Sequence, residues 1–532
     1  MDRKSRRDFL HLTGAGIAGA TLTSASALAV PIQGSPQERG AAGAIFDVKN
    51  FGAKGDGTSV DTPAINRAIE SVAAAGGGTL RFPAGTYKCF TIHLKSKVSL
   101  YLDMGATILA ADTGSEGQYD AAEPNQWDKF QDYGHSHWHN SLILGEGIDN
   151  FGIHGPGLIW GKGLSRGGRE GPKAEDPGVG NKAIALKNCR NVVLRDFSIL
   201  HGGHFGILAT GVDNFTVDNL MIDTNRDGID LDCCRNVRVS NCSVNSPYDD
   251  GICPKSSFAL GYARPTENVT ITNCFVSGYL EGSLLDGTFK RTLPRPNFSP
   301  TGRIKCGTES NGGFKNIAIS NCVFDFCRGL ALETVDGALL EDITISNITM
   351  REISNAPIFM RLGARMRGPQ GVPVGQLRRV IISNIVCSNA VSHLGSIISG
   401  IPGHEIEDVR LSDIYIQHQG GGTAADAQIQ PPEKEDAYPE PTMFGPTLPS
   451  HGFFIRHAKN IHLSNVEIAY LQEDARPVVV LQNVTGADFF RVKAQHAPAA
   501  PTFAMKQVQD FSVAQSRPVP DTLLDRADDK KL

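Results

Sequence analysis

Short runs of alternating apolar and polar residues recur along the chain, and each run begins with an Asn or Asp followed by an apolar residue. Copies begin at Asn191, Asn214, Asn236, Asn268, Asn316 and Asp342, with degenerate copies at Asp408 and Asn460. The tightest spacings run from 191 to 214, from 214 to 236 and from 316 to 342. Alternation of this length predicts strands. A period in the twenties with several short strands per repeat predicts an all-β, right-handed parallel β-helix. A leucine-rich repeat has a similar period, but its spaced leucines and helical segments are missing from this sequence.

Two segments interrupt the ladder of repeats. The first, about 44–110, is expected to cap the first coil, because Asp61 is a suitable N-cap and a helical apolar stripe follows it. The stripe consists of Ile65, Ala68, Ile69 and Val72. The second segment, about 419–450, is rich in Gly, Ala, Pro and Glu, and the ladder resumes at Phe453. It is therefore predicted to be a loop inserted between coils, where long loops commonly build a binding face.

Length and composition fit one solenoid. At about 150 residues per domain, 532 residues would make three or four domains. The repeat instead predicts one catalytic domain over 30–532, and the 58 glycines suit its many turns. The net charge of −5 offers no basic footprint for nucleic acid, so we expect no nucleic-acid partner. The expected oligomeric state is a monomer.

The segment 1–29 has the features of an export signal. Arg6-Arg7 precedes Phe9-Leu10, a mildly apolar run follows, and the segment ends in Ala27-Leu28-Ala29. The paired arginines resemble the twin-arginine type of signal, which exports folded proteins. No later stretch reaches the ~20 apolar residues of a membrane helix. The expected location is periplasmic or extracellular, without membrane attachment after cleavage.

Four of the 11 cysteines follow an asparagine at what we take to be one register of the repeat. These are Cys189, Cys242, Cys274 and Cys322. We expect their side chains to stack inside the coils as small apolar thiols; disulfides are the alternative, because the compartment is oxidising.

Acidic residues gather at one place in the repeat. Asp227 follows Asn214 at the same interval as Asp249 follows Asn236, which predicts one register on successive coils. Parallel strands lie ~4.8 Å apart, so these carboxylates would be neighbours. Asp250 adjoins Asp249, and Glu281 follows Asn268 at that same interval. Turns that favour Asp-Gly explain single members, but not three aspartates and a glutamate together. Close carboxylates that repel one another are the groups that hydrolyse glycosides.

The residues 225–230, Asn-Arg-Asp-Gly-Ile-Asp, and 249–255, Asp-Asp-Gly-Ile-Cys-Pro-Lys, resemble the polygalacturonase family, glycoside hydrolase family 28. The family pattern is Asn-Thr-Asp-Gly-x-Asp, then Asp-Asp-x-x-x-x-Lys about one coil later. The resemblance implies an inverting hydrolase of pectic polysaccharide in which Asp249 is the general acid and Asp227 and Asp250 position and deprotonate water. Lys255 would stabilise these acids or contact the sugar. No metal or organic cofactor is implied.

The chain departs from this family at two places. Glu281 replaces the histidine of Gly-His-Gly, and Glu333 replaces the lysine of Arg-Ile-Lys, which in the family faces a galacturonate carboxylate. Arg303-Ile304-Lys305 has the missing motif one coil too early, where it either supplies the positive charge or is an ordinary exposed strand. His204 is a further candidate sugar contact. These departures favour a modified or branched pectic glycan such as rhamnogalacturonan, or exo action imposed by the inserted loop.

Other classes stay open from sequence alone. A pectate-lyase-type eliminase would need an Arg or Lys base and usually Ca²⁺ on the acids, and a non-catalytic glycan-binding β-helix would need neither. His135, His137 and His139, spaced to share one side of a strand, could hold zinc, but nothing else in the sequence completes such a site.

Overall fold

The computed structural model describes residues 44–132, 134–166, 173, 176–294 and 298–532. Residues 41–532 form one compact unit, distinct from residues 1–40. The proposed signal over 1–29 lies outside the described residues and stays a prediction, as does the assignment of 30–532 to one domain. No helix within the described ranges is long and apolar enough to cross a membrane.

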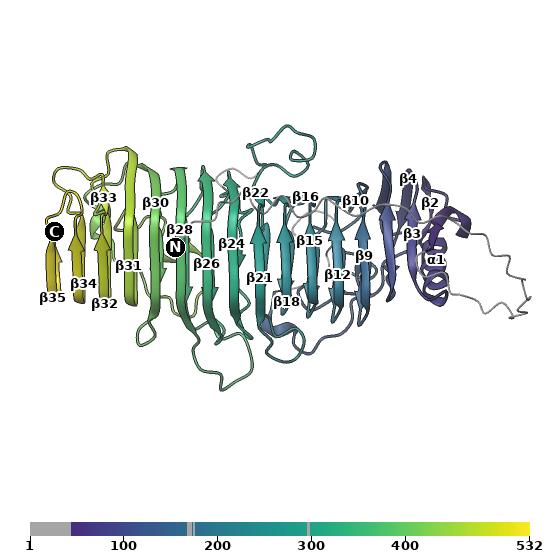
Figure 1. Ribbon diagram of the computed structural model, residues 1–532, viewed down its shortest axis with the longest axis horizontal. Helices are drawn as coiled ribbons and strands as arrows, with labels where there is room; N and C mark the ends of the chain where they lie inside the picture. Colours follow the sequence, from purple (N-terminus) through teal and green to yellow (C-terminus); the bar gives the residue numbers. More distant parts are fainter. Residues whose placement is uncertain (1–43, 133, 167–172, 174–175, 295–297) are drawn as a thin grey trace, which may run out of the picture. The chain divides into compact units, whose positions relative to one another are not determined.

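The described chain is a stack of coils whose strands pair in parallel with the coils before and after (Figure 1). The predicted parallel β-helix is confirmed. A long sheet contains 29 of the described strands. They are β1 (Ile45–Asp47), β2 (Asp56–Val60), β3 (Gly78–Phe82), β4 (Gly85–Cys89), β6 (Val98–Leu102), β7 (Ala106–Ala110), β9 (Asp149–His154), β10 (Leu158–Trp160), β12 (Arg190–Arg195), β13 (Ser198–Leu200), β15 (Asp213–Asp218), β16 (Met221–Asp223), β18 (Arg235–Ser240), β19 (Ser243–Asn245), β21 (Thr266–Thr272), β22 (Phe275–Ser277), β23 (Lys305–Cys306), β24 (Phe314–Asp325), β25 (Leu330–Thr334), β26 (Leu339–Arg351), β27 (Ile358–Leu362), β28 (Gln376–Ala390), β29 (Ser396–Ser399), β30 (Ile406–Gly420), β31 (Phe453–Gln472), β32 (Val479–Phe490), β33 (Lys493–Ala494), β34 (Phe503–Ala514) and β35 (Thr522–Lys531).

A second parallel sheet has six strands in the spatial order β20-β17-β14-β11-β8-β5. Their bounds are β5 (Ile92–His93), β8 (Ser141–Glu146), β11 (Lys182–Lys187), β14 (Phe205–Thr210), β17 (Asp227–Asp232) and β20 (Ile252–Lys255). On each coil, one side of the strand points into a continuous apolar core, as Ile207, Ile229 and Ile252 do. The other side of these strands is free to carry polar groups.

The repeated asparagines have a backbone role. Asn191, Asn214, Asn236 and Asn268 each have φ between 54° and 58°, the left-handed region that Asn and Asp tolerate better than other non-glycine residues. Their side chains stack from coil to coil, and the amide of each donates to the side-chain oxygen of the one before it at 2.8–3.2 Å. This stacking explains why the sequence ladder marks the coils.

The two ends of the stack are covered differently. Helix α1 (Thr62–Ala74) covers the first coil with the predicted apolar stripe buried. The Asp61 side chain does not cap the helix; it accepts from the backbone amides of Lys54 and Gly55 instead. At the other end β35 pairs antiparallel with β34.

All eleven cysteines are free and buried. Cys242, Cys274 and Cys322 stack on successive coils as predicted, since Ser243 pairs with Phe275 and Phe275 with Val323. Cys189 is an exception to the prediction: it precedes β12, whose partners place it in a different register. The disulfide alternative is wrong.

Candidate active site

Acidic residues meet where the last strands of the six-stranded sheet begin. Asp227 is the first residue of β17, and the pairing of Ile229 with Ile252 places Asp250 beside it on the next coil. The amide of Gly228 donates to the carbonyl of Asp250, which fixes this register. The prediction that Asp249 shares the register of Asp227 is therefore off by one residue. Asp249 lies in the turn just before, close enough to belong to the same cluster.

Asp230 and Lys255 lie on the outer face of the same strands. The Lys255 ammonium is 3.6 Å from Asp230 Oδ2, 3.9 Å from Asp227 Oδ1 and 3.6 Å from Glu309 Oε2. Burial opposes its charge, but the surrounding acids, Asp230 first, raise the pKa of Lys255. Lys255 is thus the central cation of the cluster, as the resemblance implies.

Asp227 and Asp230 are poised to hold protons. Burial, followed by the charges of Asp230 and Asp249, raises the pKa of Asp227 well above its ordinary value. Burial also raises the pKa of Asp230 to about 8, although Lys255 works in the opposite direction. Both side chains are at most 2% exposed. Buried carboxyls with raised pKa values are typical of sites that transfer protons.

Asp250 is held in the opposite state. Its Oδ1 accepts from Arg303 Nε at 2.9 Å and its Oδ2 lies 2.5 Å from Lys305 Nζ. Burial favours the neutral acid, but Lys305 and Arg303 outweigh it and lower the pKa of Asp250. Asp227 and Asp250, neighbours on adjacent coils, therefore differ in charge because only one of them is clamped by two cations.

Asp249 is the member of the cluster that faces the solvent. Its side chain is 23% exposed, and its Oδ2 accepts from Arg226 Nη2 at 2.6 Å. Oxygens of Asp249 and Asp227 approach within 4.8 Å of each other and of a His204 ring nitrogen. Arg226 occupies the position where the family pattern has threonine, and threonine could not form this ion pair.

His204 lies in the cluster, as predicted for a sugar contact. Its Nε2 is 4.0 Å from Asp227 Oδ2, its ring stacks on Phe205, and burial lowers its pKa well below the ordinary value. His135 joins it, 3.8 Å from Asp230. His137 and His139 instead contact Asp128 and Glu146, and all three lie on a loop, so the shared-face arrangement for zinc is wrong.

Glu281 lies outside this cluster, and the prediction that it shares the acid register is wrong. A loop described over 278–294 and 298–303 precedes β23, and the chain returns to the next coil at Ile304, which bridges to Ile252. Glu281 falls within that loop, 3.3 Å from Arg166. Burial, offset in part by Arg166, raises the pKa of Glu281 to about 7.

Arg303 and Lys305 are neither an exposed strand nor free receptors for substrate. They occupy the coil directly after Asp250, and their side chains are 1% and 3% exposed. Glu333 follows on the next coil, since Lys305 pairs with Ala331. It lies 3.8 Å from Arg303 and is fully buried, and burial raises its pKa to about 8. The Arg303 and Lys305 side chains therefore pair with the buried acids of the site.

The inserted loop reaches into the site. Between β30 and β31 it contains two short 3-10 helices, η3 (Asp426–Gln428) and η4 (Pro441–Phe444). Glu440 Oε1 accepts from both Arg303 and Arg328 at 2.8 Å. Tyr438, on the same loop, is 47% exposed, and its ring lies 5.7 Å from the Arg365 guanidinium.

Several buried oxygens of the cluster find no hydrogen-bond partner within the described residues. They include Asp227 Oδ1, both carboxyl oxygens of Asp230 and both of Glu333. Buried polar atoms are otherwise satisfied in folded proteins, and exceptions collect at functional sites that hold water or ligand.

Two groups of side chains could in principle ligate a metal: His135 with Asp227 and Asp230, and His204 with Asp227 and Asp249. The Lys255 ammonium lies 3.6–3.9 Å from the carboxylates of the first group, where a metal ion would compete with it. The side chains present fit an internal cation better than a bound one.

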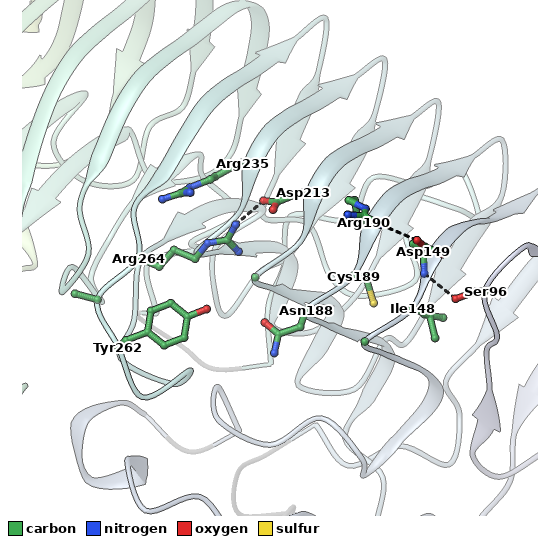
Figure 2. A pocket seen from close by; sticks show the side chains of 13 residues that line it. Ser96, Ile148, Asp149, Asn188, Cys189, Arg190, Asp213, Arg235, Tyr262 and Arg264 are labelled. Atoms are coloured by element: carbon green, nitrogen blue, oxygen red, sulfur yellow. Dashed lines mark hydrogen bonds and ion pairs between the residues drawn. The ribbon is translucent and has the colours of Figure 1, made fainter.

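A hollow of about 620 Å³ lies elsewhere, where the strands of the six-stranded sheet end (Figure 2). It is lined by residues after β8, β11 and β14, whereas the acids precede β17 and β20. Its arginines are paired: Arg190 with Asp149 at 2.8 Å and Arg264 with Asp213 at 2.6 Å. The hollow has no cluster of carboxyls that could hydrolyse a glycosidic bond.

Sequence reasoning missed four members of the site. Asp230 stood inside the quoted motif without a role, and Arg226 stood where the motif has threonine. Glu309 and Glu440 had no signal of their own, because they arrive from a later coil and from the inserted loop. Their placement depends on loop lengths that the repeat does not encode.

The fold and the site together define a parallel β-helix with a cluster of buried carboxylates at one edge of a sheet. A family model described as rhamnogalacturonase A/epimerase, pectate lyase-like, matches residues 45–253. The chain is 23% identical over 394 residues to a probable polygalacturonase of Vitis vinifera, covering 69% of this chain and 73% of that protein. It is 25% identical over 289 residues to an exo-poly-alpha-D-galacturonosidase of Dickeya chrysanthemi, covering 43% of this chain and 45% of that one.

Solved structures agree on the fold. A family 28 exopolygalacturonase of Yersinia enterocolitica superposes with a TM-score of 0.60 at 19% identity, covering 90% of this chain and 79% of that one. A hyperthermoactive exopolygalacturonase of Thermotoga maritima gives 0.56 at 18% identity, covering 80% and 92%. The resemblance to the polygalacturonases is confirmed, and these relatives support a glycosyl hydrolase.

Proposed function

We propose that the protein hydrolyses glycosidic bonds in a pectic polysaccharide of the galacturonan or rhamnogalacturonan type. The observation that carries the proposal is the cluster of Asp227, Asp249 and Asp250, in which buried carboxyls with opposite proton affinities lie on adjacent coils. Glycoside hydrolysis needs one carboxyl that donates a proton and another that stays ionised. The names of the relatives agree with this substrate class.

Asp249 is proposed as the general acid, because it alone among the three aspartates is part-exposed and can reach the leaving oxygen. It gives its proton to the glycosidic oxygen as the bond to the anomeric carbon breaks. Water attacks that carbon from the other side, and its proton passes to Asp227 once that carboxyl has given up its own proton. Asp250, fixed by Lys305 and Arg303, orients the water, while Lys255 stabilises the acids.

The proposed stereochemical outcome is inversion, as the resemblance implies. The oxygens of Asp227 and Asp249 approach within 4.8 Å, which by itself is nearer to the ~5–5.5 Å of retaining enzymes than to the ~6.5–9.5 Å of inverting ones. However, the Asp227 side chain is only 2% exposed, so water reaches it more readily than a sugar does. Anomeric NMR separates the two outcomes.

Exo action is proposed because the inserted loop is bound to the site. Arg361 donates to the carbonyls of Glu433 and Lys434, and Glu440 is held by Arg303 and Arg328. A loop anchored beside the acids limits the cleft in one direction. The test is the product series from a long galacturonan: an exo enzyme releases one small product from the start, while viscosity falls slowly. An early ladder of oligomers would contradict exo action.

The eliminase remains the second candidate, because oxygens of Asp227 and Asp249 lie within 4.8 Å of each other, and carboxylate oxygens are the ligands that Ca²⁺ prefers. Release of unsaturated, ultraviolet-absorbing products, abolished by a chelator, would favour it. Hydrolysis that a chelator does not affect would exclude it.

Export through the twin-arginine route is proposed from residues 1–29 alone. Replacing Arg6 and Arg7 by lysine should retain the protein in the cytoplasm, whereas normal export of that variant would contradict the route. The protein is proposed to act as a monomer, which size-exclusion chromatography with light scattering tests.

A further inference from the structure

The cations of the site differ in how far a substrate can reach them. Arg303, Lys305 and Lys255 have side chains 1%, 3% and 5% exposed and are occupied by the acids of the site. The position where the family pattern has a lysine facing the substrate carboxylate holds the buried Glu333. A carboxylated sugar needs a different receptor.

Arg226 is the exposed cation next to the reacting groups. Its side chain is 32% exposed, and its ion pair with Asp249 at 2.6 Å places the guanidinium at the cluster. One of its nitrogens, Nη2, is bonded to Asp249, while its buried Nε finds no hydrogen-bond partner among the described residues. The guanidinium is therefore only partly satisfied. Arginine binds carboxylates in a two-pronged manner, so a second carboxylate can compete for it.

The same ion pair conflicts with catalysis. A carboxylate that accepts a hydrogen bond from arginine at 2.6 Å is not the form that donates a proton to a leaving oxygen. Asp227, whose nearest oxygen is within 4.8 Å of Asp249, is the neighbour that can carry that proton. One water spans such a distance with two hydrogen bonds.

We infer that Arg226 is the receptor for a substrate carboxylate and that it exchanges partners when the substrate binds. In the free enzyme Arg226 is paired with Asp249 and the shared proton lies on Asp227. When a galacturonate carboxylate takes the guanidinium, the proton moves from Asp227 to Asp249. Asp249 then has the proton for the leaving oxygen, and Asp227 is ionised to accept one from water. No proton is gained or lost in the exchange. This inference rests on the proposed hydrolysis of a pectic glycan and assigns the sugar that the site selects as an acidic one.

The test compares one oligogalacturonide with the same oligomer whose carboxyls have been reduced to primary alcohols. The wild-type protein should cleave the acidic oligomer at least tenfold faster in kcat/KM, since charge-assisted bonds discriminate by about that factor or more. Arg226→Thr, which restores the residue of the family pattern, should lose at least tenfold on the acidic oligomer. On the reduced oligomer it should match or exceed the wild type, because Asp249 is no longer paired. Arg226→Lys should recover part of the acidic activity.

Arg190→Thr is the matched control: it removes an arginine paired with an aspartate at the other end of the sheet, and should change neither rate. Equal losses on both oligomers in Arg226→Thr would mean a merely structural role and would overturn the inference. So would a wild-type protein that prefers the reduced oligomer. Calorimetric binding of galacturonic acid separates the two proposals: binding lost in Arg226→Thr without turnover of any glycan would overturn the hydrolase and keep the receptor. No difference in binding between wild type and Arg226→Thr would overturn the receptor.

Discussion

The two ends of the six-stranded sheet carry charged residues of different kinds. Where its last strands begin, Asp227 starts β17 and Asp250 lies in the turn before β20, and each is 1% exposed. Where β8 and β11 end, the chain continues into Asp149 and Arg190. The Arg190–Asp149 pair is 62% and 32% exposed and joins one cation to one anion. At the acid end, by contrast, Lys255 is shared by three carboxylates. Both ends arise from the same stacking of coils, which places residues of one register on adjacent strands ~4.8 Å apart.

The two ends differ in how far their charged side chains are shielded from solvent. Exposed pairs stay screened by water and contribute about 0–1 kcal/mol each. At the acid end His135 and the inserted loop lie over the strands, so carboxyls must be clamped, as Asp250 is, or take up protons, as Asp227 does. Burial of these stacked carboxyls shifts their pKa values apart, and this difference makes the cluster suited to proton transfer.

The largest expected effect sharpens this contrast through activity. Asp249→Asn and Asp227→Asn should each lower kcat/KM for the pectic substrate by about 10³–10⁴, since each removes a proton-transfer group. Asp213→Asn, at the exposed end, should leave the rate within twofold. Initial rates from a reducing-end assay measure all three. Unchanged hydrolysis by Asp249→Asn would show that the general acid is misassigned.

A second prediction concerns stability. Lys305→Met leaves Asp250 buried with only one of its two cations, which should lower the free energy of unfolding by about 3–5 kcal/mol at pH 7. Arg190→Met should lower it by less than about 1 kcal/mol. Urea denaturation measures both. Equal losses at the two ends would break the distinction between buried and exposed pairs.

The fold was predictable because its signal is local. Asn214 and Asn236 mark their coils by a left-handed backbone and a side-chain ladder, and both features need only short-range sequence. The site was predictable to within one residue where one coil follows the next without insertion, as for Asp227 and Asp249. Counting from Asn268 failed for Glu281, because the loop described over 278–294 and 298–303 intervenes before the next coil. The clamp on Asp250 was invisible for the same reason.

The pH dependence of stability tests the protonated state of a buried acid. Burial raises the pKa of Glu333 to about 8 from an ordinary 4.5. Between these values the folded protein keeps a proton that the unfolded chain releases, so its free energy of unfolding falls as the pH rises. Glu333→Gln cannot titrate, and its stability relative to wild type should rise by about 1 kcal/mol per pH unit from pH 5 to pH 8.

Urea denaturation at four pH values in that range gives the difference directly. A constant difference would mean that Glu333 is ionised in the folded protein. Glu467→Gln, on an exposed pair with Lys493, is the matched control and should show no trend of this size.

Shortening the inserted loop should change the reaction rate least of these variants, but it should change the products. Replacing residues 433–444 by a short Gly-Ser linker removes Glu440 from the cleft and should turn single-product release into a mixture of oligomers. Chromatography of early products measures this. Unaltered products would mean that the loop does not limit the cleft.

The most direct test of the account is time-resolved ¹H NMR of the anomeric proton in a galacturonan digest, run on the wild type and on Asp249→Asn. We predict that the wild-type protein first releases the inverted anomer, which then mutarotates, and that Asp249→Asn releases none on the same timescale. A retained anomer, an unsaturated product or an unchanged signal from Asp249→Asn would contradict hydrolysis by water activated within this cluster of aspartates.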